Sequence, residues 1–353
     1  MTSKAQIMTN RTLLFIGNFL PSPKHNKNIW HFLVEHLQNA GWSVITTSNK
    51  EKQLPRLIDM LSTVWRDRQN YQAAHIDVFS GKAFIYAWLT TWMLKKLKKK
   101  IAVTLHGGGL PEFSRKHPFI FNKYLGIPDV VVTPSPFLQV SFKHLRSDIK
   151  IIPNPIDLTE SIFRQRDSIQ PRIIWVRAFH SVYNPALAVK VIARVMQSFP
   201  ETKLWMLGPD KGDHSLTNTL SLAEKLGVTH SIEIVGHVSH AGIPTWLDKA
   251  DIFLNTSNYD TAPRSLLEAM ANGLCVVTTN VGGIPHLAEN GVEAILVDPN
   301  DPESMAEAVM EILSSPDLAS TLSRNARARA EKSDWSAILP SWESLFSNLL
   351  DQS

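Results

Sequence analysis

Residues 255–285 read NTSNYDTAPRSLLEAMANGLCVVTTNVGGIP, and this stretch predicts the fold around it. Apolar runs at 252–255 and 275–278 predict two buried strands, and the segment 265–271 between them predicts a helix. A strand, a polar loop, a helix and another strand make one unit of a parallel sheet. The free backbone N–H groups of the first helical turn, near 263–266, make an anion site with the helix dipole.

Two acidic side chains flank the start of this helix. Asp260 lies in the polar loop and Glu268 lies one to two turns into the helix, so both carboxylates can face one cavity. A carboxylate suits the vicinal diol of a ribose or sugar because it accepts two hydroxyl protons. An aspartate that caps the helix and a glutamate on its solvated face explain the same residues equally well, and on the residues alone both interpretations stay open.

Strands and helices alternate along the whole chain, which predicts an α/β fold with two parallel sheets and ligands at the carboxyl ends of the strands. Strands are predicted at residues 13–16, 44–47, 74–79, 101–105, 129–133, 149–152, 173–176, 203–207, 232–235, 252–255, 275–278 and 294–297. Helices are predicted at residues 28–40, 82–97, 185–198, 216–226, 243–249, 265–271, 302–313, 318–332 and 335–350. The Pro-rich stretch 152–157 and the polar residues up to 171 predict a hinge or linker.

Length and composition limit the class of protein. A chain of 353 residues predicts two domains, since single cores rarely grow past about 250–300 residues. The 44% hydrophobic and 19% charged residues exclude disorder as the main state, and a single cysteine excludes an intramolecular disulfide framework and a cysteine-based zinc site. The longest apolar stretch, 83–94, is shorter than the roughly 20 residues that span a bilayer. Neither a P-loop nor a serine nucleophile elbow occurs.

The net charge of +4 conceals two halves of opposite sign. Residues 1–156 hold 21 Lys and Arg against 8 Asp and Glu, a net +13, whereas residues 157–353 hold 15 against 24, a net −9. Five lysines between 95 and 100 follow the aromatic residues of the predicted helix 82–97. Packing in a core explains the aromatic residues, while the lysines favour an anionic membrane surface. Nucleic acid is the competing partner, but no nucleic-acid-binding motif occurs.

The spacing of the two acids is the most specific feature. Asp260 is followed after seven residues by Glu268, then by AMANGLCVV at 269–277 and GGIP at 282–285. This window resembles the donor site of family 4 retaining glycosyltransferases (glycosyltransferase group 1), especially those of bacterial cell-surface polysaccharide pathways. The resemblance implies a GT-B fold, with two facing Rossmann-like domains and an inter-domain cleft. It also implies no cofactor and no required metal, with a nucleotide diphosphate sugar of UDP or GDP type as donor.

The resemblance assigns domains and residues. It implies an acceptor-side domain at 1–156, a nucleotide-sugar domain at 157–334 and a C-terminal helix at 335–353 that packs back on the first domain. Four residues are predicted to be catalytic: Glu268 on the ribose, Asp260 on the sugar hydroxyls, Arg177 on the diphosphate and His106 on the sugar. The predicted nucleotide-binding residues are Gly17, Arg177, Thr261, Ala262, Pro263, Arg264, Ser265, Leu266 and Glu268.

The chemistry of Arg177 and His106 supports their assignment independently of the resemblance. A departing diphosphate gains charge that a guanidinium stabilises bidentately, although a surface arginine paired with a helix acid is the alternative. His106 precedes three glycines at the end of a predicted strand, where backbone can approach a ligand closely. An incidental histidine in a glycine-rich turn is the alternative there.

The sequence departs from the family at three places. The first acid is Asp260 where the family usually has glutamate, and Gly17 stands alone in a loop that usually has two glycines. Val182 and Tyr183 stand near the place of a family lysine, and Arg264 is the candidate to supply the missing charge.

The predicted activity is transfer of a sugar to a glycan or lipid-linked acceptor by a cytoplasmic protein, peripheral on the inner face of the membrane. The alternatives are a nucleotide-sugar epimerase of similar fold and a non-catalytic sugar-nucleotide-binding protein.

Overall fold

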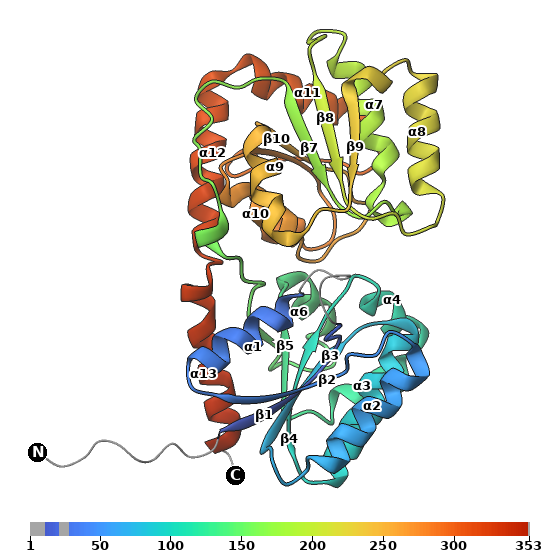
Figure 1. Ribbon diagram of the computed structural model, residues 1–353, viewed down its shortest axis with the longest axis vertical. Coiled ribbons are helices and arrows are strands. Elements are labelled where there is room, and N and C mark those ends of the chain that lie inside the picture. The colour runs from blue at the N-terminus through green and yellow to red at the C-terminus, as the bar shows by residue number, and fades with distance from the viewer. Residues whose placement is uncertain (1–10, 21–27, 352–353) are drawn as a thin grey trace, which may run out of the picture. The chain divides into compact units, whose positions relative to one another are not determined.

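The structure of the chain, a computed structural model, describes residues 11–20 and 28–351. The chain divides into two compact units: the first holds residues up to Pro153 together with those from Ser336 onward, and the second holds Asn154–Trp335. Each unit contains a six-stranded parallel sheet with helices packed against it (Figure 1). In the described part of the chain, no helix is both long and apolar enough to cross a membrane.

The first sheet has the strand order β2-β1-β3-β4-β5-β6. Its strands are β1 (Thr12–Ile16), β2 (Ser43–Thr47), β3 (Ala73–Val78), β4 (Lys100–Leu105), β5 (Val130–Thr133) and β6 (Lys150–Ile151). The helices of this unit are α1 (Ile29–Asn39), α2 (Gln53–Arg66), α3 (Phe84–Lys96), α4 (Leu110–Lys116), α5 (Pro118–Leu125), α6 (Pro136–Phe142) and α13 (Trp335–Asp351). The sequence pattern predicts all six strands but not α2, α4, α5 and α6.

Aromatic side chains fasten α13 to the first sheet. Trp342 and Phe346 of α13 stack with ring centroids 5.6 Å apart, and Phe346 meets Phe15 of β1 edge-on at 5.6 Å. All three are almost fully buried. Because burial of such a side chain stabilises a fold by about 1.5–3 kcal/mol, this helix is an integral part of the core of the first unit.

The second sheet has the strand order β12-β11-β10-β7-β8-β9. Its strands are β7 (Arg172–Val176), β8 (Lys203–Leu207), β9 (Ile232–Gly236), β10 (Ile252–Asn255), β11 (Cys275–Thr279) and β12 (Ile295–Val297). The helices of this unit are α7 (Pro185–Val195), α8 (Ser215–Lys225), α9 (Ile243–Lys249), α10 (Arg264–Ala271), α11 (Pro302–Ser314) and α12 (Pro316–Glu331). Each of these elements overlaps a range that the sequence predicts.

Both sheets contain a point at which the order of the strands reverses. In the first sheet the chain builds outward from β1 to β2 on one side and from β3 onward on the other, so the switch point lies between β1 and β3. In the second sheet it lies between β7 and β10. Open parallel sheets bind ligands outside the carboxyl ends of strands at such points.

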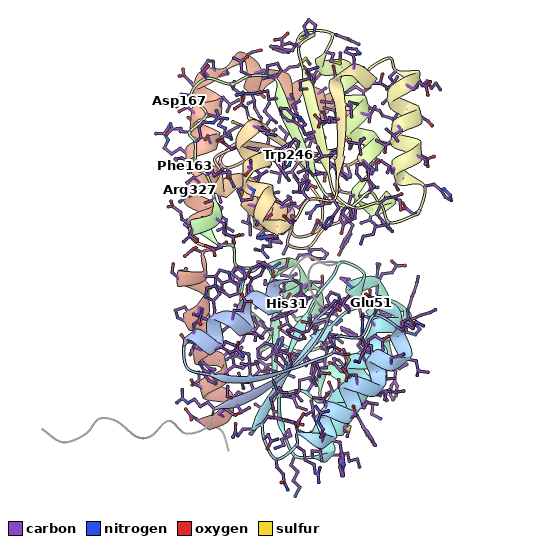
Figure 2. The ribbon with its side chains drawn as sticks, in the orientation of Figure 1. His31, Glu51, Phe163, Asp167, Trp246 and Arg327 are labelled. Carbon is purple, nitrogen blue, oxygen red and sulfur yellow. The ribbon has the colours of Figure 1, made fainter. Side chains whose placement is uncertain are left out.

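Residues 157–171, predicted as a hinge or linker, are instead packed into the second unit along α12. Asp167 accepts a hydrogen bond from Ser320 of α12, and the guanidinium of Arg327 lies 5.1 Å from the ring centre of Phe163. Phe163, Asp167 and Arg327 are seen on this side of the unit in Figure 2. The linker prediction is therefore wrong for this segment, because its polar residues bond to the helix beside it.

Asp251 is the centre of a buried ionic cluster that ties this segment to the sheet. Its Oδ1 lies 2.9 Å from Nη2 of Arg164, and its Oδ2 lies 2.7 Å from Nη2 of Arg172. Arg166 is fully buried with Nε 3.4 Å from Asp251, and burial lowers the pKa of this guanidinium to about 10. The single carboxylate therefore compensates several positive charges.

We expect Asp251→Ala to lower the free energy of unfolding by about 3–5 kcal/mol, because it leaves the buried charge of Arg166 uncompensated. The matched control is Asp248→Ala, which removes a 41% exposed carboxylate that lies 3.5 Å from Arg164. That variant should cost at most about 1 kcal/mol. Urea unfolding of the full chain measures both, and equal losses would contradict the role of the cluster.

Candidate functional site

The switch point of the second sheet brings Arg177 and Asp260 together. Arg177 directly follows β7, and Asp260 lies in the loop between β10 and α10. Nη2 of Arg177 is 2.6 Å from Oδ2 of Asp260, and each side chain is only 14% exposed. Two residues predicted to act on neighbouring parts of one ligand thus lie at one edge of the sheet, where their charges orient each other.

Two glycines allow the backbone to close around this pair. Gly208 follows β8 with φ +143°, and a Cβ at this position would collide with the carbonyl oxygen of Arg177. Gly282 has φ +56°, and its Cβ would collide with the carbonyl oxygen of Asp260. The amide of Gly283 donates to that same oxygen at 2.9 Å. The loop of Asp260 is therefore held by its backbone as well as by its side chain.

Glu268 lies on α10 among positive and polar groups. Its Oε1 is 3.0 Å from Nε2 of His240 and 2.9 Å from Nε of Arg264. Burial raises the pKa of Glu268, but the hydrogen bond with His240 and the charge of Arg264 together outweigh it and hold the pKa below its usual value. The carboxylate is thus kept ionised, as an acceptor of hydroxyl protons must be.

His240 is a site residue that the sequence pattern does not indicate. Its Nδ1 lies 3.3 Å from Oε2 of Glu160, so one imidazole links two carboxylates, those of Glu160 and Glu268. It comes from a short 3-10 turn before α9, 28 residues before Glu268. Across the described residues, no group of three or more His, Cys, Asp or Glu side chains is placed to hold a metal ion. The imidazole of His240 therefore orients the carboxylate of Glu268.

The beginning of α10 lies between Asp260 and Glu268. The helix starts at Arg264, and its N-cap residue Pro263 makes no side-chain capping bond. The amide of Thr261 donates to Oδ1 of Asp260 at 2.8 Å. Three more predicted residues lie here. The carbonyl of Ala262 accepts a hydrogen bond from the side chain of Asn154, and the side chain of Leu266 is part of the core. The Oγ of Ser265 is buried without a hydrogen-bond partner among the described residues. Only the backbone of Leu266 can therefore serve a ligand.

An aromatic ring stands where the family resemblance leads one to expect a lysine. The guanidinium of Arg177 lies 5.3 Å from the centre of the Tyr183 ring. Arg264, the candidate for the missing charge, lies against Glu268 in this structure. A tyrosine adds no charge, but it restricts the orientations of Arg177 by a cation–π contact.

His106 and Gly17 lie at the switch point of the first sheet, where both meet Asp77. Nε2 of His106 is 3.4 Å from Oδ1 of Asp77, and a Cβ on Gly17 would lie 2.8 Å from Oδ2 of the same carboxylate. Burial raises the pKa of Asp77, and the nearby imidazole of His106 opposes that rise. The ring of His106 is stacked on Phe79 at 5.4 Å. Gly17 is thus explained by the close approach of Asp77, which the sequence pattern does not indicate as a site residue.

Comparison with known proteins places the chain in a family. The family model described as "Glycosyl transferases group 1" matches residues 159–329, and the model described as "Glycosyltransferase Family 4" matches residues 30–160. This chain belongs to the group 1 glycosyltransferases. Because the two models follow each other along the chain, they cover both units, and the resemblance that the acidic motif suggests is confirmed.

One curated relative matches about half of the chain, whereas solved structures share the fold over almost all of it. The glycogen synthase of Mycobacterium tuberculosis is 28% identical over 198 residues, which is 54% of this chain and 46% of that protein. A sucrose-phosphate synthase structure from Thermosynechococcus elongatus has a TM-score of 0.80 at 19% identity, covering 97% of this chain and all of that one. The structure of Anabaena HepE in complex with UDP and glucose has a TM-score of 0.78 at 16% identity, covering 96% and 100%. The chain spans about half the length of the curated relatives it matches.

We expect Gly282→Ala to destabilise the second unit more than Gly291→Ala. Both glycines have positive φ, +56° and +75°, so each alanine carries a strain of about 1–2 kcal/mol. Only at Gly282 does the new Cβ meet backbone, whereas nothing lies within 4 Å at Gly291. The clash should add about 1–3 kcal/mol, measured by thermal unfolding. Equal shifts in Tm would show that the loop of Asp260 is not held by close backbone approach.

Proposed function

We propose that the protein is a retaining glycosyltransferase that moves a sugar from a nucleotide diphosphate sugar to a glycan or lipid-linked acceptor. The carrying observation is the Arg177–Asp260 pair at the switch point of the second sheet, close enough to α10 for the charge of Arg177 to act on Glu268. The basic group and the helix start suit the diphosphate of a single donor, and the two carboxylates suit its sugar and its ribose.

In the proposed mechanism the bond between the anomeric carbon and the leaving phosphate breaks, and the acceptor oxygen bonds to that carbon on the same face of the sugar. The leaving phosphate takes the proton of the acceptor hydroxyl. Arg177 and the first amides of α10 stabilise the charge that develops on the leaving diphosphate, so the proposal involves no metal ion and no cofactor. The Nε of Arg177 is buried without a hydrogen-bond partner among the described residues. That nitrogen can donate to a phosphate oxygen while Nη2 continues to orient Asp260.

The two carboxylates have separate tasks. Glu268, kept ionised by its neighbours, accepts hydrogen bonds from the two ribose hydroxyls. Asp260 accepts from the hydroxyls of the transferred sugar, at a point fixed by Gly282 and Gly283. His106, oriented by Asp77 and Phe79 in the first unit, contributes to positioning the sugar.

We expect Glu268→Ala to weaken donor binding by about 10- to 100-fold, because hydrogen bonds to a charged group contribute about 1.5–3 kcal/mol. The matched control is Glu311→Ala, an exposed glutamate on α11. Isothermal titration should begin with UDP-glucose, since HepE was solved in complex with it, and continue with guanosine and adenosine diphosphate sugars. Unchanged affinity in Glu268→Ala would remove the ribose assignment.

Tyr183, in the place of the expected lysine, favours one rival function: a non-catalytic sensor of sugar nucleotides. Turnover decides between them. Donor hydrolysis or transfer supports the transferase, whereas donor binding without turnover for any acceptor supports the sensor. Release of an isomerised sugar without an acceptor would instead support an epimerase.

We further propose that the first unit works in the cytoplasm, on the inner face of an anionic membrane. Large apolar side chains are more than half exposed along α2 and α3: Leu54, Ile58, Trp65, Ile85 and Trp92. The two helices are neighbours, joined by a hydrogen bond from the Tyr86 hydroxyl to the Gln53 carbonyl. We call this surface the α2–α3 face. Exposed basic residues on the same helices include Arg66, Lys95 and Lys96, as a surface that attracts anionic lipid requires.

We expect Ile58→Glu to reduce sedimentation with phosphatidylserine vesicles, because it places a like charge and removes apolar area where the α2–α3 face meets lipid. The matched control is Leu220→Glu on α8 of the second unit, also an exposed apolar residue. Wild-type binding should fall as salt is raised. Vesicle binding that is absent, independent of salt or equally sensitive to both variants would contradict the membrane proposal.

A further inference from the structure

A pocket of about 820 Å³ opens on the first unit, and none of the residues predicted to bind the donor lines it. Its apolar walls come from three helices: Ile85, Trp88 and Leu89 of α3, Phe113 of α4 and Ile120 of α5. This volume lies within the range of about 300–1,000 Å³ that is common for small-molecule sites. Ile85 is 52% exposed and Ile120 is 45% exposed. Apolar groups gathered around a hollow in this way indicate an apolar ligand.

One end of the pocket reaches the carboxyl edge of the first sheet. Ser80 and Gly109, which lie after β3 and β4, are among its lining residues. Ser80 directly follows Phe79, the residue whose ring is stacked on His106. The pocket therefore begins close to the predicted sugar-positioning residue and extends along α3 from there.

Charged groups stand at the rim rather than on the walls. Lys82 and Lys116 both line the pocket and are exposed, together with His117. The one acid of the lining, Glu112, is paired with Lys116 at 2.6 Å. An apolar hollow with a positive rim is complementary to a molecule with a hydrocarbon chain and an anionic head.

We propose that this pocket binds the hydrocarbon chain of an acceptor built on a lipid phosphate, whose phosphate lies against the rim lysines and whose sugar hydroxyl, the group that receives the transferred sugar, lies toward His106. The inference rests on the proposed function, since it names the acceptor class of that reaction. A glycan alone would leave Ile85, Trp88 and Ile120 without an apolar partner. Ile85, Leu89 and Trp92 share one side of α3, so the pocket is continuous with the α2–α3 face, from which a lipid would enter.

The test uses the full chain and farnesyl phosphate as the probe, with binding measured by isothermal titration. Ile120→Lys places a charge in the hydrocarbon path, and we expect it to weaken binding about tenfold or more. The matched control is Ile162→Lys in the second unit, because both isoleucines are 45% exposed. Farnesol should bind more weakly than farnesyl phosphate, and Lys82→Gln should reduce that difference.

Each outcome decides the matter in one direction. Farnesyl phosphate binding that Ile120→Lys weakens and Ile162→Lys leaves unchanged supports the lipid pocket. Equal binding by both variants, no binding by the wild type, or complete displacement by inorganic phosphate overturns it. Titration of UDP-glucose into the same samples separates this failure from that of the proposed function, because the donor site belongs to the second unit. Thermal unfolding followed by circular dichroism shows whether the first unit, which carries Ile120, has folded in Ile120→Lys.

Discussion

The parallel pairing of β7 with β10 is the constraint on which the proposed donor site depends. Ile252 pairs with Ile173 and Phe253 with Ile174, and all four side chains are fully buried. Because the strands run in the same direction, their carboxyl ends meet, and the residues that follow them must meet as well. A slip of one residue would turn each buried side chain to the opposite face of the sheet. The register that fills the core therefore also sets the distance between Arg177 and Asp260.

The strands and the acidic motif could be predicted because their signals are local. Short β-branched runs such as β11 are readable without knowledge of their neighbours, and the interval from Asp260 to Glu268 is fixed by a loop and one short helix. Helix α2 has a readable signal too, since residues 54, 57, 58, 61, 64 and 65 are apolar at helical spacing. The short helices α4 and α5 offer only one or two turns each, too few for a period to stand out.

The remaining site residues could not be predicted because their roles arise from distant parts of the chain. His240 meets Glu268 only after α9 and β10 have folded between them, and Asp77 meets Gly17 across the pairing of β1 with β3. Residues 157–171 look like a linker because they are polar, yet Asp251 and α12 take up those polar groups. A polar composition is compatible with exposure to solvent, but the hydrogen-bond and ion-pair partners that the fold supplies decide whether the segment is exposed.

The opposite net charges of the two halves bear differently on ligands, because some charged groups lie at contact distance from the proposed sites and others lie far from them. The half that contains the proposed donor site is acidic. A diphosphate bound there must be held at contact distance by Arg177 and helix amides rather than by the field of the domain. In the basic half, the lysines between 95 and 100 lie where α3 ends and β4 begins, at the edge opposite His106. The 13 residues of α3 separate the two edges by about 20 Å. That exceeds the screening length of about 8 Å in physiological salt, so these lysines add little to the attraction of a ligand beside His106. Charge at that edge must come from nearby groups, and Lys82 at the pocket rim is placed to provide it.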